Sequence, residues 1–228
     1  MTLRKLCIYP DAPLKQAIPT SELTIDNVKS EVKDLIDTLK HYEGNAYITS
    51  NHVGLNKRIA VIDLQTVYGK EFDSAERFLV MVNPEILELS KDTHSLQEGS
   101  ICTPDFTAVT TKSRNVKVKF DKVVLKVTET VPSTQEPATD DVKIVNNNLN
   151  FEQFDFQSET ITVWEGLAFV VQAAVLQLDG KCYLDTISWY NRERFIKKRR
   201  KVVKQFQTWV KSSLMNMGKN NRLLKNAR

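Results

Sequence analysis

The spacing of hydrophobic residues along the chain predicts two helices before its basic C-terminal part. In residues 26–42, apolar side chains recur every three or four positions, which is typical of an amphipathic helix that ends before Gly44. Residues 162–178 are apolar on almost every side, so this second helix is expected to lie buried at the centre of the molecule. The turn at Asp179-Gly180 ends it.

Strands are predicted between these two helices. Residues 57–64 form a mainly apolar run that contains Ile and Val, and residues 77–82 form a second run, rich in Val, that leads into Asn83-Pro84. Residues 116–120 alternate apolar and polar positions, a pattern that continues toward residue 127. Residues 128–150 are poor in apolar side chains and contain prolines, so we interpret them as an insertion into a mixed body of helices and strands.

The end of the chain, residues 191–228, combines a helical pattern with a strong positive charge. It holds thirteen Lys and Arg residues and one acid, Glu193, and therefore carries +12. Because the whole chain carries +4, residues 1–190 carry −8. The apolar side of this helix is expected to pack on the protein's own body. The charged sides would then stay exposed, and they could contact RNA phosphate. The apolar side comprises Ile196, Val203, Phe206, Val210, Leu214 and Met217, and Gly218 is the predicted end of the helix.

Composition narrows the class of protein. With 228 residues, 41% of them hydrophobic and 26% charged, the chain resembles globular proteins that bury a sizeable core. No apolar run approaches the roughly 18 residues that span a bilayer, and the first residues lack the apolar segment of a secretory signal. The three Cys are widely separated, so neither a disulfide framework nor a zinc knuckle is expected. We therefore expect a cytoplasmic protein of a reducing compartment, with no membrane partner.

Several segments, taken in order, carry a resemblance to one family. They are Ile8-Tyr9-Pro10-Asp11, Val53-Gly54-Leu55-Asn56, Val82-Asn83-Pro84-Glu85, Glu98-Gly99 and Leu178-Asp179-Gly180. In this order they resemble peptide deformylase, a metal hydrolase that removes the formyl group from the N-terminal methionine of nascent chains. The resemblance implies an α+β fold, with antiparallel sheets around a central buried helix, to which this chain adds a long basic C-terminal helix. We expect a deformylase-like domain at 1–190, with the insertion at about 128–150, and a helical extension at 191–228.

The family's metal centre is missing from the matching positions. In the family, iron(II) or a substitute such as zinc or nickel is held by the Cys of Glu-Gly-Cys-Leu-Ser and by two His of a helical His-Glu-x-x-His. The Glu between those His is the general base. In this chain Ser100-Ile101 replaces the Cys-Leu pair, Ala173 and Gln177 replace the two His, and Ala174 replaces the base. Because a neutral hydroxyl is a poor ligand beside a thiolate, the resemblance implies no cofactor and no hydrolysis.

The other cleft positions also depart from the family. The family's first motif, Gly-x-Gly-Leu-Ala-Ala-x-Gln, aligns with residues 45–52 but is not retained there. His52 stands where the family's Gln stabilises the oxyanion, and it retains a hydrogen-bond donor. Tyr47 replaces a Gly, so its ring is expected to fill part of the cleft beside Glu98 and Gly99. We expect Glu98 itself to support the loop of the second motif.

Three residues leave open a different metal site. Cys102 lies two positions beyond the lost thiolate, His52 is expected in the same cleft, and His94 lies slightly upstream. The competing interpretation makes Cys102 a small buried apolar residue, His52 a hydrogen-bonded cleft residue and His94 a loop residue. An active hydrolase with such a non-standard site is the alternative to a protein without catalytic activity.

We expect the retained fold to serve binding. Family enzymes dock on the ribosome through a C-terminal helix, and the helix in this chain is long and basic. A nascent peptide N-terminus is a second candidate partner, unless Tyr47 blocks the pocket. Trp189, Tyr190 and Trp209 are candidates for base stacking, with packing on the body as the alternative. The residues expected to contact ribosome or RNA phosphate are Lys197, Lys198, Arg199, Arg200, Lys201 and Lys204.

Overall fold

The computed structural model describes residues 3–69, 72, 77–104, 106–123 and 156–201. The chain divides into two compact units, Met1–Tyr183 and Leu184–Arg228, and each is described by itself. The predicted insertion at 128–150 lies outside the described residues, as does the tail beyond residue 201. Within the described part, no helix is both long and apolar enough to cross a membrane.

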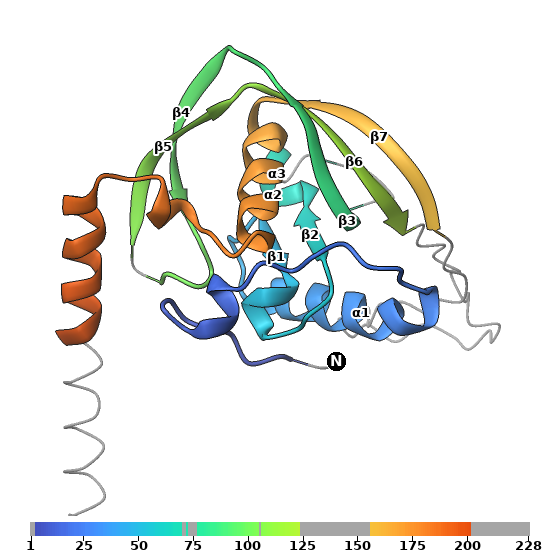
Figure 1. The fold of residues 1–228 in the computed structure, drawn as a ribbon, viewed down its shortest axis with the longest axis horizontal. Coiled ribbons are helices and arrows are strands. Elements are labelled where there is room, and N and C mark those ends of the chain that lie inside the picture. The colour runs from blue at the N-terminus through green and yellow to red at the C-terminus, as the bar shows by residue number, and fades with distance from the viewer. Residues whose placement is uncertain (1–2, 70–71, 73–76, 105, 124–155, 202–228) are drawn as a thin grey trace, which may run out of the picture. The chain divides into compact units, whose positions relative to one another are not determined.

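The first unit is built on two antiparallel sheets, which Figure 1 shows on either side of a central helix. The larger sheet has the strand order β1-β2-β3-β6-β7, and the smaller one pairs β4 with β5. Its five strands are β1 (Tyr47–Thr49), β2 (Ile59–Asp63), β3 (Phe78–Leu89), β6 (Asn115–Val123) and β7 (Phe156–Trp164). The two strands of the smaller sheet are β4 (Thr93–Gly99) and β5 (Thr107–Ser113).

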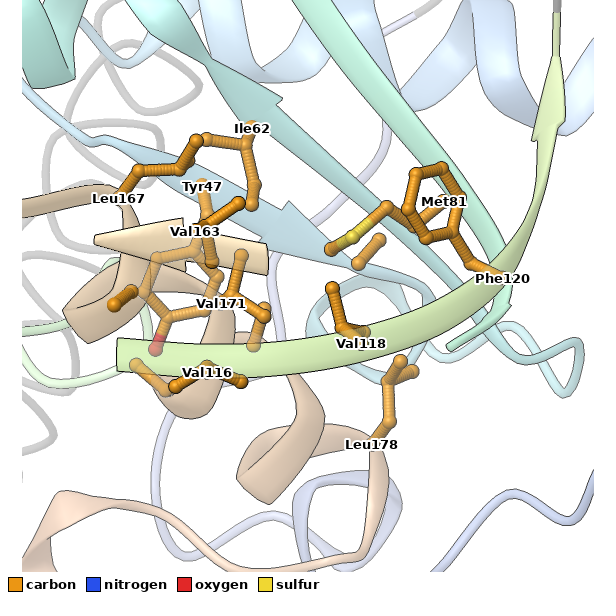
Figure 2. Packing of buried hydrophobic residues seen from close by; sticks show 14 of the residues in the cluster. Tyr47, Ile62, Met81, Val116, Val118, Phe120, Val163, Leu167, Val171 and Leu178 are labelled. Carbon is orange, nitrogen blue, oxygen red and sulfur yellow. The ribbon is translucent and has the colours of Figure 1, made fainter. Parts of the chain in front are cut away.

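The central helix, α3 (Glu165–Leu178), is the buried element that the sequence predicts. It contacts the strands of the larger sheet and also β5 of the smaller one. Its Leu167, Val171 and Leu178 join Ile62 of β2 and Val118 of β6 in one cluster of buried side chains (Figure 2). Because protein surrounds the helix, apolar residues are stable on nearly every side of it.

Strand β2 is covered on both faces, which explains why its sequence is continuously apolar. Ile62 and Ala60 face the cluster around α3, whereas Ile59 and Val61 belong to a second cluster with α1 (Ile25–His41). The observed α1 confirms the helix predicted at 26–42. The shorter helices are η1 (Ala12–Lys15), η2 (Ser50–Val53), α2 (Leu64–Tyr68) and η3 (Tyr183–Asp185).

The helix predicted at 162–178 is wrong at its start. Residues 162–164 are the end of β7, where Trp164 pairs with Asn115 of β6. At Glu165 the backbone φ is 49°, and the chain passes from strand to helix at this residue. An apolar residue suits both a buried strand and a buried helix, so the local pattern does not locate this boundary. Pairing with β6 decides it.

Strand β3 also runs farther than the sequence indicates, continuing to Leu89 past an irregularity after Val82. The backbone at Asn83 has a φ of 51°. Beside it, the buried Arg58 guanidinium donates to the carbonyl oxygens of Pro84 and Ile18 at 3.1 and 2.9 Å, and its Nη1 lies 2.8 Å from Oδ1 of Asp179. Arg58 therefore ties the strand irregularity to the N-terminal segment and to the end of α3.

The described part of the second unit is mainly a helix at residues 189–201. This helix is the start of the basic tail. Within it the guanidinium carbon of Arg194 lies 5.8 Å from the centre of the Tyr190 ring, a cation–π arrangement.

Candidate functional site

A cavity of about 970 Å³ opens in the first unit beside β1, β4 and α3. Its wall includes apolar side chains such as those of Leu6, Leu96 and Phe169, together with the carboxylate-bearing residue Glu98. The structure brings most residues that the sequence assigns to the cleft to this wall: Tyr47, Glu98, Gly99, Ser100, Ile101 and Ala173.

The positions matched to the family's metal centre lie close to the same wall. Ser100 is in the turn that follows β4, and Ala173, Ala174 and Gln177 lie on α3. Ala173 is 3% exposed, and both Ala174 and Gln177 are fully buried. The Ser100 hydroxyl lies 3.1 Å from the Cys102 sulfur, which in turn is 4.0 Å from Oε1 of Gln177. Cys102 therefore bridges two of the former ligand positions.

His52 contacts the same group from η2. Its Nε2 lies 3.4 Å from the Ser100 hydroxyl oxygen, and its Nδ1 accepts a hydrogen bond from the Thr49 backbone N–H at 3.0 Å. The Thr49 hydroxyl oxygen lies 3.0 Å from the same Nδ1 and donates its own proton to Oδ1 of Asn51. Because a backbone N–H can only donate, its contact favours Nδ1 as an acceptor, with the proton of the neutral ring on Nε2. Burial lowers the pKa of the imidazole to about 3, which keeps it neutral.

This tautomer does not suit a serine nucleophile activated by His52. A general base must accept the hydroxyl proton through Nε2, and a partner on Nδ1 must accept a proton to support it. In this protein both relations are reversed, because Thr49 donates to Nδ1 and Nε2 carries the proton.

Cys102 is also unsuited to nucleophilic chemistry. Its side chain is fully buried, and burial raises the pKa of the thiol to about 11. The thiolate, which is the reactive and metal-binding form, is therefore disfavoured at neutral pH.

The side chains at the family's ligand positions do not fit a divalent metal. They are a hydroxyl, a methyl group and a carboxamide, none of which supplies the thiolate or imidazole that the family's site requires. Within the described residues, no group of three or more His, Cys, Asp and Glu side chains is placed to hold a metal ion.

His94 lies apart from the Ser100 contacts, and the expectation that it lies in a loop is wrong. It is on β4, where it pairs with Lys112 of β5. Its Nδ1 is 3.2 Å from Oε2 of Glu165, and its ring centre is 5.6 Å from that of Phe169. Backbone pairing with β5, which the local sequence does not reveal, decides this placement.

Tyr47 is part of the core as well as of the cavity wall. Figure 2 shows its ring within the cluster that includes Leu167 and Val171 of α3. Burial raises the pKa of its phenol well above the usual value, and the nearby Glu98 adds to the effect. The ring centre lies 5.7 Å from that of His52. The Tyr47 ring, which stands where the family has a Gly, thus packs between β1 and α3.

Glu98 is held in the wall by a buried ion pair. Its Oε2 accepts hydrogen bonds from the Lys112 ammonium and the Thr110 hydroxyl. Burial lowers the pKa of Lys112, whereas the attraction of Glu98 opposes that change. The Lys112 ammonium also lies 4.1 Å from the centre of the Phe169 ring. These contacts link β4, β5 and α3 and are consistent with the supporting role expected for Glu98.

Comparison with known proteins decides which family this fold and cleft represent. The family model described as polypeptide deformylase matches residues 3–132. The chain belongs to the peptide deformylase family.

Relatives of this deformylase family member cover nearly the same length. It is 24% identical to a peptide deformylase of Bartonella tribocorum over 91% of this chain and 97% of that protein. It is 26% identical to a protein of Rickettsia conorii described as peptide deformylase-like, over 86% of each chain. The crystal structure of a peptide deformylase from Legionella pneumophila matches with a TM-score of 0.67 and 20% identity, covering 91% of this chain and 98% of that one. This likeness confirms the predicted α+β deformylase fold.

Sequence reasoning missed three residues that shape the deformylase cleft in this chain. Thr49 sets the tautomer of His52, Asn51 donates to the backbone carbonyl of Gln177, and Lys112 pairs with Glu98. Thr49 and Asn51 lie inside residues 45–52, the segment aligned with the family's first motif. That alignment could have marked both as candidate cleft residues. Nothing in the local sequence marks Lys112, because the antiparallel pairing of β4 with β5 brings it to Glu98.

The tail residues expected to meet RNA are partly described. Lys197, Lys198, Arg200 and Lys201 are exposed and Arg199 is half-buried. Lys204 and Trp209 lie outside the described residues. Trp189 is 74% exposed and Tyr190 is 64% exposed, so both rings have free surface on this helix.

Proposed function

We propose that this chain is a non-catalytic member of the peptide deformylase family that works by binding. The observation that carries the proposal is the donor set at the family's metal positions, where Ser100, Ala173 and Gln177 replace one thiolate and two imidazoles. Deformylation relies on a metal to acidify water and on a general base, and the base position is Ala174. The neutral, Nε2-protonated His52 and the high pKa of Cys102 support the same conclusion.

Metal content and turnover test the absence of catalysis. The purified protein is analysed for iron, zinc and nickel and is assayed with a formyl-methionyl peptide, beside a deformylase that has the complete metal motif. We expect less than about a tenth of an equivalent of metal and no hydrolysis above buffer, since neither a metal-bound water nor a base remains. Stoichiometric metal together with turnover would establish the alternative, a hydrolase with a non-standard site.

The binding partner that we propose is ribosomal or other RNA, contacted by the basic helix. Arg194, Lys197 and Lys201 follow one another at intervals of three and four residues, so they share one side of the helix with Tyr190. All four are exposed. A row of cations that ends in an aromatic ring suits a phosphate backbone with a neighbouring base. The net charge of −8 on residues 1–190 would repel RNA, so attraction is expected to come from the tail.

Salt-dependent sedimentation with ribosomes tests this partner in the full chain. Lys197, Lys198 and Lys201 are changed together to Gln, which preserves helix propensity. We expect weaker binding, and a slope of log affinity against log salt that is shallower by roughly 0.7–0.9 for each phosphate that a lysine no longer neutralises. The matched control changes Lys91, Lys119 and Lys181, which are exposed lysines of the first unit, to Gln. Equal effects of the two triple variants, or binding insensitive to salt, would refute the proposal.

We propose a second ligand for this protein, a peptide N-terminus that the cavity binds without cleaving it. Its volume of about 970 Å³ and its apolar wall fit an apolar first side chain. Titration calorimetry with formylated and free methionyl peptides tests this idea. Binding that is weakened by Leu96→Asp on the cavity wall would support it, and the absence of binding for both peptides would exclude it.

A further inference from the structure

The side chains around Ser100 form a connected group, because short contacts link His52 to Ser100, Ser100 to Cys102 and Cys102 to Gln177. We propose that a chain of hydrogen bonds through His52, Ser100, Cys102 and Gln177 has taken over the cross-linking role of the family's metal. The inference rests on the proposed absence of the metal, and it assigns these four side chains a structural function.

The two ends of this hydrogen-bond chain determine its direction. At one end the Thr49 N–H donates to Nδ1 of His52 at 3.0 Å. At the other end the carboxamide nitrogen of Gln177 donates to the Leu14 carbonyl oxygen at 3.1 Å. A backbone N–H can only donate and a backbone carbonyl can only accept, so His52 must donate through Nε2 and Gln177 must present Oε1 toward Cys102.

The intermediate steps follow from these ends. His52 Nε2–H donates to the Ser100 hydroxyl oxygen, whose own proton then points to the Cys102 sulfur at 3.1 Å. The Cys102 S–H donates to Oε1 of Gln177 at 4.0 Å. Each side chain thus both accepts and donates along this route, and the Ser100 oxygen also accepts from the Cys102 backbone N–H at 3.4 Å. The buried polar groups are paired without any added ion.

The hydrogen-bond chain joins segments that are distant in sequence. His52 is on η2, Ser100 and Cys102 are in the turn after β4, and Gln177 is on α3. Two further hydrogen bonds extend the junction, since the Tyr9 backbone N–H donates to the Cys102 carbonyl at 2.9 Å and the Asn51 side-chain amide donates to the Gln177 carbonyl. In the family the metal joins the second motif to the helix, and here the side chains join the same two elements.

The same hydrogen bonds occupy the atoms of His52 and Cys102 that could bind a metal. Nδ1 of His52 accepts from Thr49, and Nε2 carries a proton. Cys102 keeps its proton for Gln177 and accepts from Ser100. A metal bound by His52 and Cys102 would require these bonds to be broken and the thiol to be ionised, so the same contacts oppose the alternative site.

Nuclear magnetic resonance on the unaltered protein tests the direction of the hydrogen-bond chain. The rings are labelled with ¹⁵N, and the three His are assigned with His41→Gln and His94→Gln variants, so His52 stays intact. We expect His52 in the Nε2–H form with a proton that exchanges slowly with water. An Nδ1–H form, or an average of both forms, would overturn the inference.

Exchange of the His52 ring proton then tests whether the side chains act as a unit. Ser100→Ala removes the acceptor and should speed exchange by roughly five- to tenfold. Cys102→Ala should speed it on the order of threefold, although Cys102 is one bond farther away. Adding Cys102→Ala to Ser100→Ala should cause no further change, and Cys7→Ala should match the unaltered protein. Additive effects, or an unchanged rate in Ser100→Ala, would contradict the inference.

The two proposals fail separately. Bound metal with turnover would remove the proposed function and this inference with it. A metal-free, inactive protein in which His52 has the other tautomer would remove only the inference.

Discussion

At the scale of single residues, His52 shows how burial and one backbone contact redirect the chemistry of a side chain. An exposed imidazole titrates near pH 6.5, whereas burial brings the pKa of His52 to about 3. The Thr49 N–H selects the tautomer. A residue that by type could bind metal or act as a base is therefore a neutral hydrogen-bond donor.

Acid should reveal the burial of His52. Between pH 6.5 and about 3 the unfolded chain binds a proton at His52 that the folded chain does not, so the free energy of unfolding falls as pH is lowered through this window. The contribution is up to about 1.4 kcal/mol per pH unit, or about 2 kcal/mol at pH 5. Urea unfolding at about pH 7.5 and pH 5 measures it.

Two variants isolate His52 from other groups that titrate in acid. His52→Gln should lose less stability than the unaltered protein over the same pH range, because Gln does not titrate. His41→Gln, which changes an exposed histidine, should keep the full loss of stability. An equal loss in the two variants would show that His52 is not buried as a neutral ring.

At the scale of elements, the junction after α3 is set by backbone geometry that only Gly allows. Gly180 has a φ of +73°, and a Cβ built on it would lie 2.7 Å from both the Ala17 nitrogen and the Lys15 carbonyl oxygen. The same junction includes the Ile18 N–H, which donates to the Leu178 carbonyl at 2.8 Å, and the ion pair of Arg58 with Asp179. The N-terminal segment thus closes directly over the end of α3.

Gly180→Ala should therefore destabilise the protein more than the same substitution at another glycine whose φ is also positive. Gly44 has a φ of +81°, but nothing lies within 4 Å of its Cβ position. Gly44→Ala should cost about 1–2 kcal/mol for the left-handed backbone alone. Gly180→Ala should cost roughly 1–3 kcal/mol more, because backbone atoms must move apart. Thermal and urea unfolding compare the two variants, and equal losses of stability would contradict the close packing.

At the scale of the whole molecule, the protein combines a deformylase fold with an uneven charge distribution, which the net charge of the whole chain does not reveal. The net +4 is the sum of +12 on residues 191–228 and −8 on the rest. Under the proposed absence of a metal, packing around α3 and side-chain hydrogen bonds stabilise the first unit.

Metal should therefore have little effect on the unfolding of the full chain. A ligand that binds only the folded state adds about 2.7 kcal/mol when its concentration is 100 times its Kd. We expect the Tm to change by less than about 1 °C when zinc or nickel is added in excess, or when a chelator is added. A deformylase with the complete metal motif is the control and should be stabilised by its metal. Stabilisation of this chain by metal would indicate a site that the described residues do not show.

Sequence patterns predicted the elements whose signals are local. The helical spacing at 26–42 appears as α1, and the continuously apolar run at 57–64 contains β2. They misplaced the start of α3, because Val163 and Trp164 suit a strand and a helix equally well. They also misassigned His94, whose strand depends on pairing with β5.

The sequence by itself determined which chemical groups are present: too few thiolate and imidazole side chains at the matched positions, and a basic tail on an acidic body. These are properties of single residues and sums over residues, and folding does not change them. Only the tertiary structure decided how those groups satisfy one another, since Thr49, Ser100 and Gln177 meet through contacts between distant segments. Hydrogen-bond direction and burial depend on such contacts, and they make the family's metal site a closed set of neutral partners in this chain.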